Sequence, residues 1–289
     1  MNYVTDDTMN AYLRTVQPMY DGVLGEIQKE AIAAEVPIVP PEVARLLSVL
    51  LTMQKPKNIL EIGTAVAFSA GLMCRYLPEE GTVTTIDRYE VMLKDARVNI
   101  KRMGLEDKIK ILEGDAADIL PTLEGTYDVI FMDAAKGQYQ AFLPHCLRLL
   151  PVGGLLIVDD VLQGGTIAQT RFSVPRRQRT IHKRLRNFLW EITHNDALET
   201  SIVPIGDGVA LCYKKKEIEF KEPEAEGDTD DAEYEKTGIA GTCRRSGKAE
   251  DCCALWCGCG IYRWGGLWSA RQSEEFRYRH HGGGGQVCP

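Results

Sequence analysis

The chain has 289 residues, of which 44% are hydrophobic and 26% are charged. This composition is typical of a water-soluble globular protein, and the length allows one large domain or two small ones. There is no run of about 18 apolar residues, and the N-terminus lacks the basic start and apolar stretch of a secretory signal, so we expect a cytoplasmic protein without a membrane partner. The formal net charge of −7 does not exclude a basic face for an anionic partner.

Residues 1–57 precede the first predicted strand and have helical character. Apolar residues follow helical spacing over residues 9–34 and 41–54, and prolines at positions 37, 40 and 41 mark the break between the two stretches. We predict a helical N-terminal extension that covers the sheet edge or contacts a second copy of the chain.

Residues 58–215 alternate short β-rich runs with helical patterns. The predicted strands are NILEIG, TVTTID, IKILEG, YDVIFMDA and GGLLIVDD. Strands separated by helices indicate βαβ units, in which helices cover both faces of a parallel sheet. Two further runs, TSIVPIG and GVALCYKKK, flank Asp207 and predict a closing antiparallel hairpin. The predicted fold is therefore an α/β, Rossmann-like, doubly wound domain with a mostly parallel seven-stranded sheet.

The composition changes after Lys216. Residues 216–235 contain ten carboxylates and two lysines, so we expect this run to be disordered. The remaining tail, within residues 216–289, holds six of the nine cysteines, whereas Cys74, Cys146 and Cys212 fit reduced core positions. The tail has soft zinc ligands but lacks the paired C-x2-4-C spacing of structural zinc sites. The spacing therefore favours the alternative interpretation, a non-native or vestigial extension, over a zinc site. The candidate ligands of such a zinc site are Cys252, Cys253, Cys257, Cys259, His280 and His281.

The loop after the first strand, EIGTAVAFSAG, begins with Glu61 and Gly63 and places Ser69 near the start of the next helix. It does not match G-x-G-x-x-G, because Ala65 and Phe68 stand where the later glycines would fall. A dinucleotide site needs those glycines for its pyrophosphate. The loop therefore suits a ligand without phosphates.

Acidic residues follow the next two predicted strands. Asp87 lies where α/β nucleotide-binding folds place an acid on a ribose diol, and Asp115 is suited to an adenine amino group. Each acid alone has an alternative explanation as a helix N-cap. Their recurrence at successive strand ends favours binding of an adenosine group.

Three further acids follow the fourth and fifth strands. Asp133 ends one run, and the adjacent Asp159 and Asp160 end the other. If the two strands are parallel neighbours, these carboxylates meet at one edge and need a cation, and their oxygens suit Mg²⁺, Mn²⁺ or Ca²⁺. The alternative is that Asp159 and Asp160 only cap a helix or solvate a loop.

Residues 58–215 resemble the class I S-adenosylmethionine-dependent O-methyltransferases of the metal-dependent catechol/caffeoyl-CoA type, and residues 1–57 fit the helical extension of that family. The segments YDVIFMDAAKGQYQ, DDVLQGG and VPIGDGVAL most closely resemble its bacterial tRNA 5-hydroxyuridine methyltransferase branch, which forms 5-methoxyuridine at the wobble position. The resemblance implies a homodimer that uses S-adenosylmethionine and a divalent metal, for which we expect Mg²⁺.

The resemblance also assigns site residues by position. Asp133, Asp159 and Asp160 would hold the metal, and Lys136 would lie beside the acceptor oxygen as the catalytic residue together with Asp133. The sequence departs from the family pattern at Ala67, where the family has glycine, and at Asp160, where it has asparagine. Residues that would contact the methyl donor are Glu61, Gly63, Ser69, Asp87, Asp115, Ala116 and Asp133.

The family chemistry has a physical basis. A divalent ion chelated by two neighbouring acceptor oxygens lowers the pKa of the hydroxyl and orients it toward the sulfonium methyl. Lys136 would take the proton or stabilise the oxyanion, and both roles require it within hydrogen-bond reach.

A basic segment follows the predicted metal loop. Residues 171–186 carry seven lysines or arginines and no acid, which favours contact with a phosphate backbone over a merely solvated helix face. We therefore predict the anticodon loop of tRNA as the substrate, with a small catechol-like acceptor as the alternative. The predicted RNA-binding residues are Arg171, Arg176, Arg177, Arg179, Lys183, Arg184 and Arg186.

Two other functions are compatible with the pattern. A nicotinamide-dependent oxidoreductase would use the same sheet topology, but the glycine fingerprint is missing. A non-catalytic RNA-binding relic of the fold would explain the departures at Ala67 and Asp160. Methyl transfer distinguishes an active enzyme from both.

Overall fold

The computed structural model of the protein describes residues 7–218. The predictions for the tail, namely disorder after Lys216 and either a zinc site or a non-native extension, concern residues outside that range. No helix within it is long and apolar enough to cross a bilayer. Cys74, Cys146 and Cys212 are free thiols in the core, as the sequence predicts.

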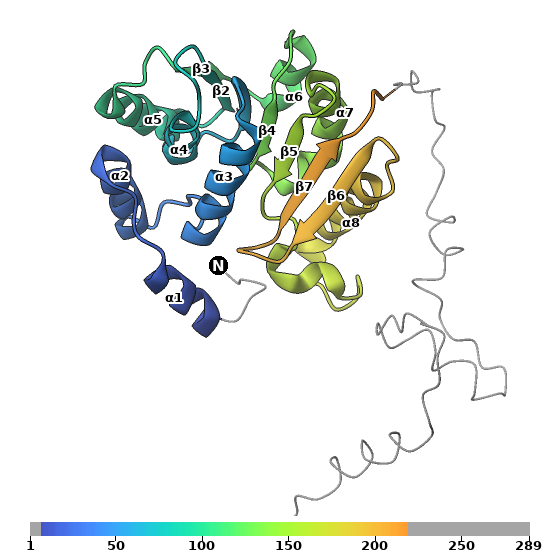
Figure 1. Cartoon of the computed structure of the whole chain (residues 1–289). Coiled ribbons are helices and arrows are strands. Elements are labelled where there is room, and N and C mark those ends of the chain that lie inside the picture. Colours follow the sequence, from blue (N-terminus) through green and yellow to red (C-terminus); the bar gives the residue numbers. More distant parts are fainter. Residues whose placement is uncertain (1–6, 219–289) are drawn as a thin grey trace, which may run out of the picture. The chain divides into compact units, whose positions relative to one another are not determined.

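A seven-stranded sheet forms the centre of the protein (Figure 1) and confirms the predicted fold class. The strand order is β3-β2-β1-β4-β5-β7-β6, with β1 to β5 parallel and β7 antiparallel to both of its neighbours. The chain thus winds outward from β1 in one direction and from β4 in the other. The strands are β1 Asn58–Ile62, β2 Thr82–Asp87, β3 Ile109–Glu113, β4 Val129–Met132, β5 Leu155–Val158, β6 Leu198–Val203 and β7 Val209–Lys214.

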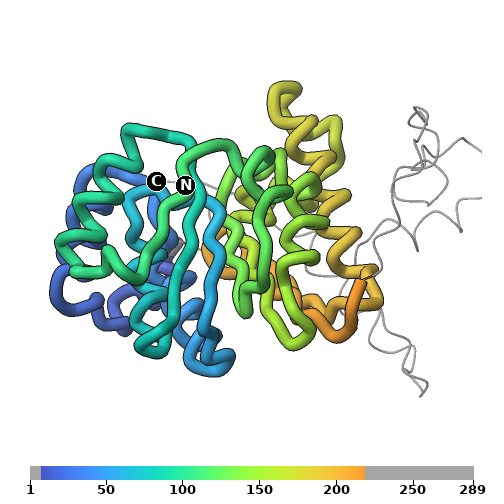
Figure 2. The backbone as a smooth tube through the Cα atoms, turned by 90° about the horizontal axis from the view of Figure 1, so that it is seen from above, coloured from blue at the N-terminus to red at the C-terminus, as the bar shows by residue number. Residues whose placement is uncertain are grey.

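Helices cover both faces of the sheet because successive strand residues point to opposite sides. In β4, Val129 and Phe131 pack with the helices α2 to α5, whereas Ile130 and Met132 pack with α7 and α8. In Figure 2 the N-terminal half of the described chain, blue to teal, lies to one side of the β1–β4 boundary, and the C-terminal half lies to the other. The helices are α1 Asp7–Val16, α2 Gly22–Ala33, α3 Pro41–Gln54, α4 Phe68–Cys74, α5 Glu90–Met103, α6 Ala116–Ile119, α7 Tyr139–Leu149 and α8 Arg179–Thr193, with 3-10 turns η1 Leu120–Thr122, η2 Lys136–Gln138, η3 Gln163–Ala168 and η4 Arg176–Gln178.

The N-terminal helices share the core of the sheet. The helical stretch predicted over residues 9–34 is divided into α1 and α2, because Pro18 lies in the break and cannot supply a helical N–H donor. The Arg14 guanidinium donates two hydrogen bonds, at 2.9 and 2.7 Å, to the buried carboxylate of Glu42 on α3. Leu24 and Leu47 from α2 and α3 are buried in the same cluster as Ile59 of β1. The extension therefore packs as part of the sheet domain.

The β6–β7 hairpin holds the loop that follows β5. The N–H groups of Val161 and Leu162 donate to the carbonyls of Gly208 and Asp207 at 3.0 and 2.9 Å. Gly208 has φ +88°, and a Cβ at this position would lie 2.3 Å from Cγ of Leu162. The close approach of hairpin and loop thus requires glycine.

The requirement for glycine at position 208 can be tested by comparing alanine substitutions at Gly208 and Gly125. Both residues have φ near +85°, but a Cβ at Gly125 has no neighbour within 4 Å. We expect Gly125→Ala to lower the free energy of unfolding by about 1 kcal/mol through backbone strain alone. Gly208→Ala should lower it by about 2–4 kcal/mol, because steric overlap adds to the strain. Urea unfolding of both variants measures the difference, and equal losses would contradict the proposed close contact.

Candidate functional site

A cavity of about 330 Å³ opens at the carboxyl ends of β1, β2, β3 and β4. It lies where the strand order reverses between β1 and β4, the usual ligand position in open α/β sheets. All the residues predicted to contact the methyl donor line it except Glu61. The sequence did not identify the other lining residues, which include Pro37, Ile38, Val39, Arg88, Tyr89, Gln138 and Phe142.

The first loop of the cavity has an unusual backbone. Gly63 has φ +110°, and a Cβ there would lie 2.0 Å from the carbonyl oxygen of Asp133, so only glycine allows β1 and β4 to end so close together. Ala65 and Ala67 also have positive φ, at 44° and 62°. Alanine adopts this left-handed conformation at a cost of about 1–2 kcal/mol. The chain therefore retains a loop shape suited to glycine although Ala67 occupies that position.

Asp87 and Asp115 combine structural contacts with exposure to the cavity. The Asp87 carboxylate accepts hydrogen bonds from the N–H groups of Thr64 and Ala65, both at 3.0 Å, and so ties β2 to the first loop. Asp115 caps α6 by accepting from the N–H of Ala117 at 2.9 Å. That hydrogen bond and the Arg88 guanidinium 2.6 Å away lower the pKa of Asp115. The N-cap interpretation is thus correct for Asp115, and its side chain still lines the cavity.

Glu61 is fully buried beside the cavity instead of lining it. Its Oε2 accepts a hydrogen bond from the Thr85 hydroxyl at 2.6 Å, and that hydroxyl lies 2.6 Å from the hydroxyl of Thr64 in the first loop. Its Oε1 is buried without a hydrogen-bond partner. Burial raises the pKa of Glu61 to about 8. Ionisation of this buried side chain in the folded protein therefore costs free energy.

Asp133 and Asp159 lie at adjacent strand ends. Their backbone N–H groups continue the sheet ladder, donating to the carbonyls of Ile62 and Met132 at 2.9 Å. Loss of water around the carboxyl, together with the nearby Asp160, raises the pKa of Asp133 to about 7. Burial, together with Asp133 and Asp160, raises the pKa of Asp159 well above its usual range. The sheet thus brings together carboxyl groups that oppose one another's ionisation.

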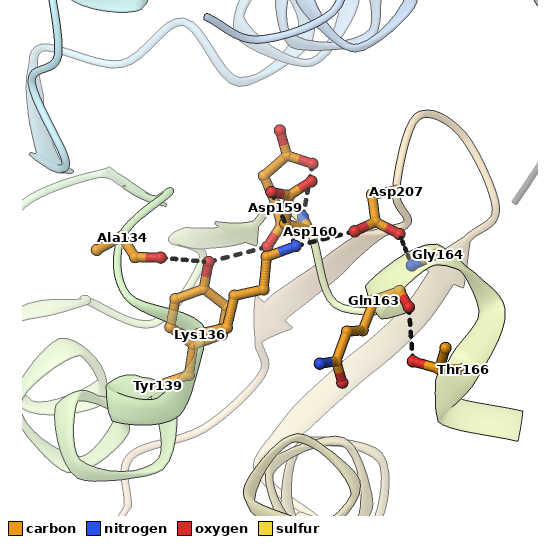
Figure 3. Close-up of polar contacts among 9 residues, drawn as sticks. All are labelled: Ala134, Lys136, Tyr139, Asp159, Asp160, Gln163, Gly164, Thr166 and Asp207. Carbon is orange, nitrogen blue, oxygen red and sulfur yellow. Dashed lines mark hydrogen bonds and ion pairs between the residues drawn. The ribbon is translucent and has the colours of Figure 1, made fainter. Parts of the chain in front are cut away.

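Lys136 supplies the nearby positive charge (Figure 3). Its Nζ lies 3.0 Å from Oδ2 of Asp160 and 2.9 Å from Oδ2 of Asp207. Burial alone would lower the pKa of Lys136, but the two carboxylates outweigh burial and raise it. Asp207 is the site residue that the sequence did not identify. The signal was its position between two glycines in the closing hairpin, which we interpreted only as a turn.

The three predicted metal ligands are neighbours but do not form a ready-made ligand set. Within residues 7–218, no group of three or more His, Cys, Asp or Glu side chains is arranged to hold an ion. The physical reason is that like charges repel and the Asp160 carboxylate pairs with Lys136 instead. Asp160 has φ +60°, a conformation that asparagine also adopts readily, so the backbone accommodates either residue. The oxygen donors still suit a hard divalent ion, which would relieve the charge on Asp133 and Asp159.

Side chains of the basic segment, residues 171–186, form hydrogen bonds within the protein, are exposed to solvent, or both. Arg184 on α8 donates to the carbonyl of Gly137 at 3.1 Å, next to Lys136. Arg179 and Arg186 donate to carbonyls of the preceding loop, including that of Val174 at 3.1 Å and that of Gln169 at 3.4 Å. Exposed members of the segment are Arg171, Arg176, Arg177, Lys183 and Arg184. The segment therefore supports the turn that carries Lys136 and presents positive charge to solvent.

Comparison with known proteins identifies similar chains. Residues 19–215 match the family model described as O-methyltransferase. The chain is 31% identical to the caffeoyl-CoA O-methyltransferase of Populus kitakamiensis over 61% of its own length and 77% of that protein. It is 33% identical to the catechol O-methyltransferase of Niastella koreensis over 61% of its length and 82% of that protein. The structure of an O-methyltransferase from Bacillus cereus in complex with SAH is 27% identical, with a TM-score of 0.63 over 72% of this chain and 97% of that one.

The buried state of Glu61 predicts a specific pH dependence. The unfolded carboxyl loses its proton near its ordinary pKa of 4.5, whereas the folded one keeps it up to about pH 8. Stability contributed by the protonated group is therefore complete below pH 4.5 and falls as the pH rises to 8. We expect Glu61→Gln to gain roughly 2–4 kcal/mol over the parent protein between pH 5 and pH 8, since one pKa unit is worth about 1.4 kcal/mol.

Urea unfolding at the two pH values measures this gain. Glu124→Gln, at an exposed position before β4, serves as the control and should shift stability equally at both pH values. A Glu61→Gln difference that stays constant between pH 5 and pH 8 would show that Glu61 ionises normally in the folded protein.

Proposed function

The chain belongs to the O-methyltransferase family and is an S-adenosylmethionine-dependent O-methyltransferase, and from that premise we propose that it methylates one hydroxyl of a small aromatic acceptor with two neighbouring oxygens. The observation that carries the proposal is the Lys136 ammonium held among carboxylates beside the cavity. The relatives named for caffeoyl-CoA and catechol favour this acceptor over the tRNA hydroxyuridine that the sequence predicted. The family assignment also removes the basis for the oxidoreductase interpretation.

The cavity would hold the methyl donor. Asp87 would accept hydrogen bonds from the ribose diol, and Asp115 would accept one from the adenine amino group. Gly63, Ser69 and Ala116 would form the walls. The sulfonium of S-adenosylmethionine supplies the methyl group as an electrophile. Glu61 would not contact the methyl donor directly, but would hold Thr85 and, through it, the first loop in place.

A divalent ion would be held by Asp133, Asp159 and Asp160, and Mg²⁺ suits these oxygen donors. When bound, such an ion lowers the pKa of a hydroxyl and fixes the direction of two neighbouring oxygens. The raised pKa values of Asp133 and Asp159 support a cation at this position, because positive charge would favour their ionised forms.

Lys136 would stabilise the acceptor oxyanion. Because Asp160 and Asp207 raise its pKa, the ammonium stays protonated near neutral pH and is a hydrogen-bond donor instead of a base. A fixed positive charge where negative charge develops accelerates transfer without reorganising water. Of the two roles predicted from the sequence, this one therefore fits the site better.

A second candidate acceptor is 5-hydroxyuridine in the anticodon loop of tRNA. The observation that favours it is the contact between Arg184 and Gly137, which places the basic segment directly beside Lys136. Arg171, Arg176, Arg177 and Lys183 are exposed and would contact phosphates, with Arg179 and Arg186 supporting their loop.

We also propose that the protein is a homodimer that acts in the cytoplasm. Exposed apolar side chains on α1 and α3 support a contact with a second copy, since burying them would remove apolar surface from water. They include Tyr12, Val16, Val49 and Met53.

The acceptor can be assigned by transfer of labelled methyl groups. We expect conversion of a catechol, with at least tenfold less product when a chelator removes divalent ions. Lys136→Ala should lower kcat about 10²–10³-fold, as for loss of other charge-stabilising donors. The control is hydroxyuridine-containing tRNA as the sole acceptor. Methylation of the tRNA but not the catechol would establish the second candidate, and transfer to neither would refute the proposed activity.

The proposed metal site can be tested at Asp160. Asp160→Asn removes one negative charge but keeps an oxygen donor, so we expect Mg²⁺ to bind about tenfold more weakly, equivalent to about 1.4 kcal/mol. Calorimetric titration of the variant measures the affinity directly. Asp118→Asn, at an exposed position on α6, controls for the loss of net charge. Unchanged or tighter binding by Asp160→Asn would mean that Asp160 is not a ligand of this kind.

A further inference from the structure

Asp207 connects three segments of the chain at the edge of the site. It lies in the turn between β6 and β7, flanked by Gly206 with φ +59° and Gly208 with φ +88°. Its contact with Lys136 joins residues 71 positions apart in the sequence. The residue is 8% exposed, so its carboxylate is largely shielded from water.

The two carboxylate oxygens of Asp207 have different partners (Figure 3). Oδ2 accepts a hydrogen bond from Lys136 Nζ at 2.9 Å, and Oδ1 accepts one from the N–H of Gly164. The backbone carbonyl of Asp207 also accepts from the N–H of Leu162 at 2.9 Å. These contacts fix the carboxylate from both sides. Asp207 therefore fixes the position of Lys136 relative to the loop after β5.

Asp160, the other partner of Lys136, is held less firmly. Its side chain is 29% exposed against 11% for Asp207. It also follows Asp159 directly and lies near Asp133, so it is the carboxylate that a cation at those two residues would attract. The hydrogen-bond partners of Asp207 are Lys136, Gly164 and Leu162, and none of them is a carboxylate that would share a cation with it.

We propose that Asp207 is the positioning residue of Lys136: it would keep the ammonium at the acceptor oxygen even if Asp160 served as a ligand of a bound divalent ion. This inference rests on the proposed methyl transfer. Without Asp207, Lys136 would follow Asp160 or turn to solvent, and the ammonium would leave the position where charge develops. A misplacement of about 1 Å costs on the order of 10²-fold in rate, so the effect belongs to kcat.

The test is Asp207→Asn, which keeps an oxygen for the Gly164 N–H but removes the negative charge that faces Lys136. We expect kcat to fall about 10–100-fold, with KM for the methyl donor within twofold of the parent value. Asp207→Glu keeps the charge and should recover part of kcat. In the Lys136→Ala background, Asp207→Asn should lower kcat less than twofold further, because the group that it positions is absent.

The matched control is Glu199→Gln on the same hairpin. Glu199 forms an exposed ion pair with Lys215 at 2.9 Å, so its loss removes a charge from the hairpin without touching the site. Its kcat should equal that of the parent protein. A purely structural role for Asp207 would lower kcat by the same factor with and without Lys136, and that result would overturn the inference.

A second measurement is independent of activity. It is made in an Asp160→Asn background, because Asp160 would otherwise still hold the lysine. There, acetylation of Lys136 with acetic anhydride, followed by peptide mass spectrometry, should be at least fivefold faster when Asp207→Asn is added than when Glu199→Gln or no further change is added, because the lysine is then released to solvent. Equal rates would overturn the inference. If the parent protein methylates no acceptor but the labelling rates differ as expected, the proposed function fails while the positioning contact stands. If Asp207→Asn does not fold, Asp207→Ser takes its place in the kinetic and labelling experiments, because it also removes the carboxylate from Lys136. Parent values of both kcat and labelling rate would then overturn the inference.

Discussion

Burial of several carboxyl groups at the carboxyl edge of the sheet is the constraint on which the site depends. Parallel pairing of β1, β4 and β5 brings Glu61, Asp133 and Asp159 to neighbouring strand ends, where burial raises the pKa of each carboxyl. Placing such groups together destabilises the fold unless protons or cations compensate them. Lys136 compensates part of this charge. Carboxyl groups that ionise only beside positive charge suit a positively charged ligand, and both the sulfonium of the methyl donor and a divalent ion are of that kind.

The loops around this charge hold conformations that only a few residues tolerate. Ala65 and Ala67 in the first loop, and Asp160 and Gln163 after β5, all have positive φ. Each costs free energy that surrounding contacts must offset. Asp87 supplies those contacts to the first loop, and the β6–β7 hairpin supplies them to the loop after β5. The antiparallel hairpin is therefore a support for the site as well as the closing element of the sheet.

The surroundings of Lys136 are built mainly from the C-terminal half of the sheet domain. The turn that carries Lys136 packs against α8, and Arg184 fastens it there. Changes along α8 can thus alter the surroundings of Lys136 without touching β1 to β3 and the loops that line the cavity.

The sequence by itself determined the strands, the closing hairpin and the acids at strand ends, because hydrophobic periodicity and turn residues are local signals. It also indicated Lys136, Asp87 and Asp115, through motifs that lie within single loops. Only the tertiary structure showed that Asp207 reaches Lys136, that Asp160 pairs with the lysine, and that Pro37 to Val39 line the cavity. Those relations join segments far apart in the chain. They depend on how strands and hairpin pack, which no local pattern of residues encodes.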